Sequence, residues 1–78
     1  MDNGVKKVYY ANGNIEKEEN YINDEEHGLN KKYYANGKIK SEENFYNGDK
    51  HGECKYYDET GKLKQINTYY YGYLLSVK

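Results

Sequence analysis

The sequence lacks proline, tryptophan and arginine and contains one cysteine. A single cysteine excludes an intrachain disulfide, and the first residues show no basic segment, apolar run or lipidation motif. We therefore expect a reduced, cytoplasmic protein. Apolar residues are scarce too, since hydrophobic residues make up 36% of the chain and that figure includes 12 tyrosines. A chain of 78 residues has room for one small domain, and its stability must depend on aromatic packing.

An excess of one charge is also absent, because 12 lysines are balanced by 13 acidic residues for a net charge of -1. Such a chain has no overall field that would attract it to nucleic acid or to an anionic membrane. We therefore expect neither as a partner. No nucleotide-binding loop, catalytic triad or metal-binding motif is present in the sequence, so we expect no enzymatic activity and no cofactor.

A repeat of 24 residues is the most informative feature that is present. Copies 5–28 and 29–52 are identical at 13 of 24 positions, and copy 53–76 keeps 7 identities with the second. Such a period is typical of repeat architectures, in which the terminal copies act as caps. Leu74 and Leu75 replace the Lys50-His51 pair in the last copy. We expect one domain over residues 1–78, capped by its C-terminal copy.

Each repeat has the pattern strand, turn, strand. In the second copy the aromatic pair Tyr33-Tyr34 precedes Ala35-Asn36-Gly37, which predicts a three-residue turn with the glycine in the left-handed conformation. Residues 46–48 have the same form and predict a second three-residue turn. The sequence therefore predicts an all-β fold, in which three tandem 24-residue β-hairpin repeats form a thin, elongated, six-stranded antiparallel meander.

Two such turns set the expected pairing register. They place Tyr33 across from Ile39 in an apolar row, and Glu18 across from Lys6. A second row is expected on the same face, near Gly28 and Gly52, which leave room for its rings. That row consists of Tyr21, Phe45 and Tyr69. The polar strip between the rows is expected to include Lys31, Ser41 and Glu43.

Three groups of residues suggest chemistry, and for each a structural role is the better interpretation. His27 and His51 recur at the repeat spacing, but zinc needs three or four ligands and Cys54 is the only further soft ligand nearby. The pairs Glu18-Glu19 and Glu42-Glu43 are adjacent on strands, so their members point to opposite faces and cannot act on one bond. Cys54 has no matching base and orienting group.

The tracts KKVYY, KKYY and CKYY interleave lysine with tyrosine, a composition that can hold phosphates while the rings stack on bases. Glu16, Glu18 and Glu42 are expected on the same face and argue against direct nucleic-acid binding. Exposed tyrosines on a sheet favour a protein partner instead. The predicted contacts are even-numbered residues of one face: Tyr10, Tyr34, Tyr46, Tyr56, Tyr70, Lys32 and Lys40.

Residues 33–52, YYANGKIKSEENFYNGDKHG, resemble the bacterial variant of the MORN repeat. Its unit joins a paired aromatic, Asn-Gly, an acidic pair, a second aromatic with Asn-Gly, and a closing His-Gly. The chain is also similar to the YwqK-type family, whose members carry tandem copies of this unit and are often classed as antitoxins. The resemblance covers about residues 4–73, although the third copy departs at 58–60 and lacks the closing His-Gly. It implies an antiparallel hairpin array used for binding.

These observations support two classes of function. The first is a small protein-binding module that neutralises or inhibits a partner, as an antitoxin does, with a toxin-like protein or a nuclease as the partner. A phage-type inhibitor of a bacterial defence nuclease is an alternative that works in the same way. The second class is a structural, self-associating repeat, in which the apolar C-terminal stretch YYYGYLLSVK pairs two copies into a homodimer.

Overall fold

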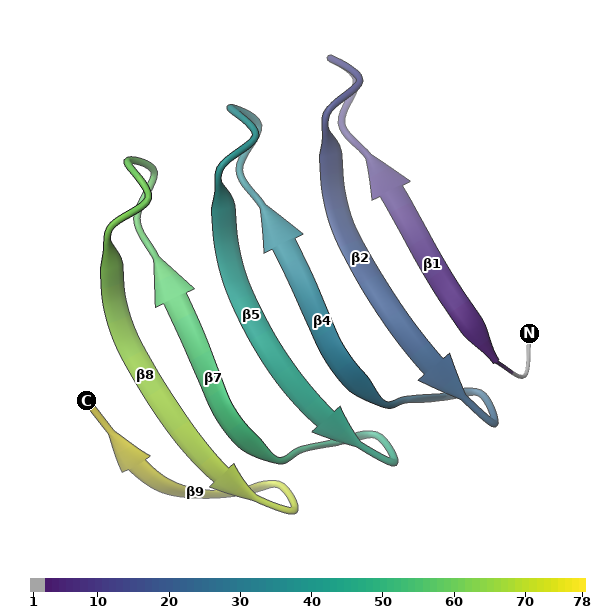
Figure 1. The fold of residues 1–78 in the computed structure, drawn as a ribbon, viewed down its shortest axis with the longest axis vertical. Helices are drawn as coiled ribbons and strands as arrows, with labels where there is room; N and C mark the ends of the chain where they lie inside the picture. Colours follow the sequence, from purple (N-terminus) through teal and green to yellow (C-terminus); the bar gives the residue numbers. More distant parts are fainter. Residues whose placement is uncertain (1–2) are drawn as a thin grey trace.

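The computed structural model describes residues 3–78 and consists of one open antiparallel sheet (Figure 1). Three hairpins lie side by side in chain order. They are formed by β1 (Gly4–Tyr9) with β2 (Ile15–Ile22), by β4 (Gly28–Tyr33) with β5 (Ile39–Tyr46), and by β7 (Gly52–Tyr57) with β8 (Leu63–Tyr70). The predicted all-β meander of three hairpin repeats is therefore confirmed.

Three further strands extend this arrangement beyond the six that the sequence predicts. Two-residue strands β3 (Glu25–Glu26) and β6 (Asp49–Lys50) pair with β2 and β5, and β9 (Tyr73–Val77) pairs with β8. Because the C-terminal stretch continues past its turn as β9, the sheet follows the order β1-β2-β4-β5-β7-β8-β9. The prediction of six strands was thus one long strand short.

The sheet is a single layer, with extents of 35 × 34 × 11 Å. Among the described residues, four are buried, and three of these are polar: Cys54, Asn30, Ser41 and Glu43. The interior is therefore a strip beneath neighbouring side chains of one face and not the space between two layers. No helix in residues 3–78 is long and apolar enough to cross a membrane.

The turns at the top of Figure 1 form the upper rim, which comprises residues 10–14, 34–38 and 58–62. The Tyr34 backbone N–H donates to the Lys38 carbonyl at 2.8 Å, and the Gly37 N–H donates to the Tyr34 carbonyl at 2.9 Å. Gly37 has φ +90°, where a side chain would add strain. The predicted three-residue turn is confirmed here, and the other two hairpins repeat it.

The turns at the opposite end form the lower rim, residues 23–24, 47–48 and 71–72. Tyr46 pairs with Asp49 across Asn47 and Gly48, which have φ +48° and +88°. Two successive left-handed residues make a two-residue turn of type I′, which suits the twist of a hairpin. The expected three-residue turn was wrong at this rim, because Asn-Gly alone satisfies the tighter turn without the preceding tyrosine.

A β-bulge follows each upper turn. Tyr33 pairs with Ile39 as predicted, but the next pair inward is Lys32 with Ser41, so Lys40 is an extra residue. The same register shift occurs in the other two hairpins. Because side chains alternate along a strand, one extra residue exchanges the faces of everything beyond it.

The bulge changes which side chains are neighbours. Glu18 lies across from Lys7 and not, as expected, from Lys6. Phe45 lies directly across from Gly28, and five residues separate Gly28 from Tyr33 on β4. An odd separation on one strand means opposite faces. The two aromatic rows therefore lie on opposite faces, and the expectation of a shared face was wrong.

We name the two faces after one residue each. The Cys54 face carries Asn30 and Lys32 of β4, Ser41, Glu43 and Phe45 of β5, and Cys54 and Tyr56 of β7. The Leu29 face carries Leu29, Lys31 and Tyr33 of β4, Glu42 and Asn44 of β5, and Lys55 of β7. All four buried residues belong to the Cys54 face. Lys31 is thus separated from Ser41 and Glu43, with which it was expected to lie.

A second irregularity lies at the lower rim. The pairing of β5 shifts by two residues between β6 and β7, because His51 and Gly52 have no partner on β5 in the ladder. The His51 backbone N–H donates to the Asn44 carbonyl at 2.9 Å. Gly52 has φ +92°, while a Cβ added there would meet only the Asn44 Cβ at 4.0 Å. The backbone conformation, and not room for a ring, requires this glycine.

Candidate interaction surfaces

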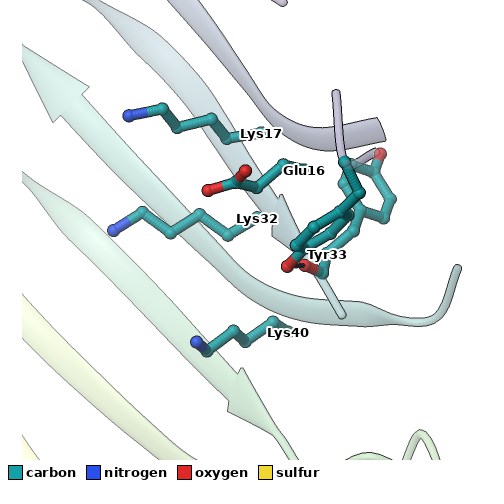
Figure 2. A pocket seen from close by; sticks show the side chains of 6 residues that line it. Glu16, Lys17, Lys32, Tyr33 and Lys40 are labelled. Carbon is teal, nitrogen blue, oxygen red and sulfur yellow. Dashed lines mark hydrogen bonds between the residues drawn. The ribbon is translucent and has the colours of Figure 1, made fainter. Parts of the chain in front are cut away.

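A cleft of about 250 Å³ opens at the upper end of the Cys54 face, between the first and second repeats. Figure 2 shows three lysine side chains extending from it in the same direction, with Glu16 between two of them. We call it the lysine cleft, and its lining residues are Tyr10, Glu16, Lys17, Lys32, Tyr33 and Lys40. The bulges help to build this site, because Glu16 and Lys40 are the extra residues that turn toward this face.

Like charges face one another in the lysine cleft. Lys17 on β2 pairs directly with Lys32 on β4, an arrangement that destabilises a sheet. Lys32 reaches Glu43 at 3.8 Å, and Lys40 Nζ lies 5.6 Å from the centroid of the Tyr34 ring. Within residues 3–78, Lys17 forms no ion pair within 4.0 Å. The cleft is therefore a positively charged recess with one carboxylate.

Tyrosine hydroxyls hold neighbouring repeats together at this end. The Tyr10 hydroxyl donates to the Tyr33 carbonyl and the Tyr34 hydroxyl to the Tyr57 carbonyl, each at 2.6 Å. Each bond spans 23 residues and joins equivalent places in successive hairpins. Both rings are thereby fixed in position, so their first role is to bind the repeats to one another.

Glu43, which is 7% exposed, lies at the centre of a buried polar network on the Cys54 face. It accepts a hydrogen bond from the Tyr56 hydroxyl at 2.9 Å and pairs with Lys50 at 3.1 Å and Lys32 at 3.8 Å. Burial opposes the charge, but the Tyr56 and Lys50 bonds outweigh it and hold the pKa of Glu43 below its ordinary value. Burial and this carboxylate raise the pKa of Tyr56. Tyr56 thus helps to stabilise the buried part of the sheet by its hydrogen bond to Glu43.

The first repeat places two acids where the second has this ion pair. Glu19 and Glu26 occupy the positions of Glu43 and Lys50, and both line a cleft of about 200 Å³ beside Lys32. The Asn30 side-chain amide donates to Glu26. Burial, followed by the charges of Glu19 and Glu43, raises the pKa of Glu26. We call Glu19 and Glu26 the acidic pair.

The lower rim carries an aromatic cluster of five rings: Tyr46, Tyr70, Tyr71, His27 and His51. Tyr71 lies at the centre, with ring centroids 5.6 Å from Tyr46, 4.7 Å from Tyr70 and 4.1 Å from His51. His27 lies 4.9 Å from Tyr46. The three tyrosines are nevertheless 44%, 57% and 44% exposed, in the order Tyr46, Tyr70, Tyr71. Ring contacts of this kind restrict the rotamers of side chains that still face solvent.

Tyr71 adopts a strained backbone conformation, with φ +43°. The equivalent residues of the other repeats are Asn23 and Asn47, with φ +51° and +48°, and asparagine tolerates this region far better than tyrosine. A bulky residue held there costs about 1–3 kcal/mol. The Tyr71 backbone N–H donates to His51 Nδ1 at 3.0 Å, which helps to hold the turn.

The comparisons with known proteins agree with this geometry. A family model described as a MORN repeat variant matches residues 2–23, 26–47 and 50–69, one match for each hairpin. The chain belongs to this family. No curated protein and no solved structure matches it. The three MORN units recur every 24 residues, as the hairpins do.

The MORN array distributes the seven predicted contact residues over the sheet. Tyr10, Lys32 and Lys40 line the lysine cleft, with Tyr34 beside Lys40. Tyr46 and Tyr70 belong to the aromatic cluster at the other end, and Tyr56 joins the Glu43 network. They do not form one continuous surface, because the bulges break the parity rule by which they were grouped. Glu18 and Glu42 accordingly lie on the Leu29 face, away from Lys32.

Other residues of these surfaces were not predicted as contacts: Lys17, the acidic pair, Tyr71 and the two histidines. A signal was available for two of them, since Glu26 and Tyr71 differ in charge or type from their counterparts Lys50 and Asn47. In residues 3–78, no three His, Cys, Asp or Glu side chains are placed to hold a metal ion. Cys54 is fully buried, and burial raises the pKa of its thiol, as suits a structural residue.

Proposed function

We propose that this MORN repeat protein is a protein-binding module that inhibits a partner by occupying it, with the aromatic cluster of the lower rim as its main contact surface. One observation supports this most: Tyr71 takes a conformation that suits asparagine and still exposes 44% of its surface. Residues kept in costly conformations concentrate at functional sites. Its contacts with neighbouring rings offset part of that strain, and the exposed part of the ring is open to a partner.

The chemistry of the cluster suits a protein partner. Tyrosine is enriched at binding hot spots because it offers a large amphipathic contact with few rotatable bonds. Ring contacts with His51 and Tyr46 order Tyr71 before binding, so less entropy is lost when the complex forms. A thin sheet of fixed curvature can present this rim to a cleft in another protein.

The finer form of the proposal names the partner as a toxin-like protein, in the manner of an antitoxin, or as a nuclease. A small sheet that covers the substrate channel of such an enzyme stops the reaction without any chemistry of its own. A phage-type inhibitor of a bacterial defence nuclease would work by the same occlusion. The resemblance to repeat proteins classed as antitoxins supports this form.

Exchanging Tyr71 for the asparagine of the other repeats tests the proposal. We expect Tyr71→Asn to keep or raise the melting temperature, because it removes strain, and to weaken capture of the partner from an extract of cells that carry the gene. Tyr9→Asn is the control, since it removes a ring that is 59% exposed near the upper rim. The partner recovered with the control must lose activity when the protein is added.

The proposal fails if Tyr71→Asn and Tyr9→Asn capture the same proteins in the same amounts. It also fails if the captured partner stays fully active in the complex. A wild-type protein that captures nothing above background would exclude the module altogether.

Self-association through β9 is a second candidate, favoured by the exposed apolar side chains of that strand. Tyr73, Leu74, Leu75 and Val77 are 75%, 54%, 64% and 54% exposed, and within residues 3–78 β9 pairs with β8 alone. By contrast β1 carries Lys6 and Lys7, charges that discourage edge pairing. Light scattering should then give a dimer mass for the wild type and a monomer mass for Leu75→Lys.

A further inference from the structure

Two pairs of like charges lie next to each other on the Cys54 face, one between the first and second repeats and one within the first repeat. Lys17 faces Lys32 across β2 and β4. Two residues further along β2 is Glu19, which together with Glu26 forms the acidic pair. Lys32 lines both clefts, so the lysine cleft adjoins the cleft of the acidic pair. Glu43, Lys31 and Lys50 also line the second cleft, and Glu43 is paired there with Lys50 and Lys32, so the acidic pair is the part of it that a basic side chain can meet.

The other repeats avoid both pairs of like charges, although their backbone is the same. At the positions equivalent to Lys17 and Lys32, between the second and third repeats, Ser41 pairs with Tyr56. In place of Glu26 the second repeat has Lys50, which pairs with Glu43 at 3.1 Å. The sheet can therefore be built without either conflict, and local conflicts that a fold does not need are expected at functional sites.

The acidic pair is hydrogen-bonded, since the Tyr21 hydroxyl donates to Glu19 and the Asn30 amide donates to Glu26, but neither bond neutralises the charge. Within residues 3–78, neither member of the acidic pair lies within 4.0 Å of a lysine nitrogen, although Lys6 occupies the position across from Glu19. Lys17 and Lys40 likewise form no ion pair at that distance in this part of the chain. Lys32, the third lysine of the cleft, pairs with Glu43 at 3.8 Å, and Glu16 adds one negative charge between Lys17 and Lys32 (Figure 2).

We propose that this face binds an extended segment of the protein partner, with an acidic side chain in the lysine cleft and a basic side chain against the acidic pair. The inference rests on the proposed function, since it assumes a protein partner, but it uses a different surface from the aromatic cluster. The two recesses are about two residues apart along β2, or about 7 Å. In an extended segment, side chains at i and i+2 lie on one face at that separation.

Charge complementarity selects this occupant over a polyanion. A nucleic-acid strand or an anionic membrane would satisfy Lys17 and Lys40 but would place further negative charge against Glu19 and Glu26. A segment with one charge of each sign satisfies both recesses. Complementarity of this kind sets specificity and register more than raw affinity.

The test uses dye-labelled nine-residue peptides and fluorescence anisotropy at low salt. One peptide carries Glu and Lys two residues apart, a second carries the same residues three apart, and a third carries only acidic charges. A thymidine oligonucleotide and anionic phosphatidylserine vesicles serve as polyanionic probes. We expect the first peptide to bind saturably and about fivefold more tightly than any other probe, the ratio that one exposed charge pair can supply.

Two variants separate binding from folding. Glu26→Lys sets a lysine against Glu19, as Lys50 lies against Glu43 in the second repeat, but it removes the acceptor of the buried Asn30 amide. It should weaken the first peptide about fivefold, and circular dichroism in the same buffer should show the sheet content of the wild type. Lys17→Glu should weaken that peptide by a similar factor. The controls make the same charge changes outside the clefts: Glu25→Lys on the neighbouring residue and Lys38→Glu in the upper turn. Both should leave the affinity of the first peptide unchanged.

Several results would overturn this inference. They are equal binding of the first and second peptides, tighter binding of the oligonucleotide or the vesicles, unchanged affinity in Glu26→Lys, and no saturable peptide binding. None of these affects the proposed function, because the aromatic cluster is tested with Tyr71→Asn. If Tyr71→Asn loses the partner while Lys17→Glu and Glu26→Lys keep it, the module stands and this inference falls.

Discussion

Replacing Glu43 by glutamine should destabilise the sheet strongly, and the size of the effect follows from its contacts. The carboxylate accepts a bond from the Tyr56 hydroxyl at 2.9 Å and pairs with Lys50 at 3.1 Å. A hydrogen bond to a charged group contributes about 1.5–3 kcal/mol. Glutamine retains the Tyr56 bond but loses the charge, and the Lys50 side chain is 34% exposed, so water compensates in part. We expect a loss of about 2 kcal/mol, or a fall of about 10 °C in melting temperature for a domain of this size.

The pH dependence provides a second, independent check on this carboxylate. Its pKa is lower in the folded protein than the ordinary value of 4.5. A depressed carboxyl pKa adds stability that is fully present above the unfolded value and is lost as the pH falls through the folded one. The wild type should therefore be more stable than Glu43→Gln at pH 7, and the gap should shrink at pH 3.

Urea unfolding followed by circular dichroism at pH 7 and pH 3 measures both effects. Glu53→Gln, a neutralisation at an exposed position on the Leu29 face, is the matched control and should change the unfolding free energy by less than about 0.5 kcal/mol. The reasoning is refuted if Glu43→Gln matches this control at pH 7. It is equally refuted if the difference from the wild type is as large at pH 3 as at pH 7.

Further substitutions test the turns and the contacts between repeats. Gly37→Val should lower the melting temperature more than Lys38→Val, because valine is strained at φ +90°; equal values would contradict the turn. Tyr34→Phe should lower the unfolding free energy in urea by about 1 kcal/mol by removing the bond to the Tyr57 carbonyl. His51→Phe keeps a ring but removes the acceptor for the backbone N–H of the last turn. Amide exchange in that turn should accelerate while exchange in β4 stays the same.

The period and the upper turns were predictable from sequence because they depend on residues with few alternatives. Gly37 follows Ala-Asn after an aromatic pair, and only a left-handed residue closes such a three-residue loop well. The pairing of Tyr33 with Ile39 follows directly from that loop. The residues of each upper turn were therefore sufficient to predict the turn and the strand pair next to it.

The register beyond the turns was not predictable in the same way. Tyr46-Asn47-Gly48 fits both a three-residue and a two-residue turn, and the two differ in which face every later residue occupies. The bulge at Lys40 leaves no mark in the sequence, since any residue can take the extra position. Both uncertainties concern a shift of one residue, and such a shift decides whether a side chain is a contact or part of the interior.

The candidate surfaces were therefore predicted by residue type more accurately than by position. Tyr46 and Tyr70 do lie in an exposed aromatic cluster, but Tyr56, selected by the same parity rule, donates to buried Glu43. The same parity rule excludes Tyr71, whose number is odd. At a two-residue turn neither residue belongs to a face, so parity carries no information there.

The repeats themselves supply a better criterion than parity, because each unit is a control for the others. At some backbone positions one repeat has a residue that fits the local conformation and charge, while another repeat has a residue that lowers the folding stability. Folding alone does not explain such a difference. Tyr71 in the place of Asn47, and Glu26 in the place of Lys50, are two such positions. Tyr71 leaves an aromatic ring 44% exposed, and Glu26 puts a half-buried carboxylate where the second repeat has an ion-paired lysine. Restoring asparagine at position 71 should therefore keep or raise stability while it reduces binding, whereas loss of an ordinary structural contact lowers stability.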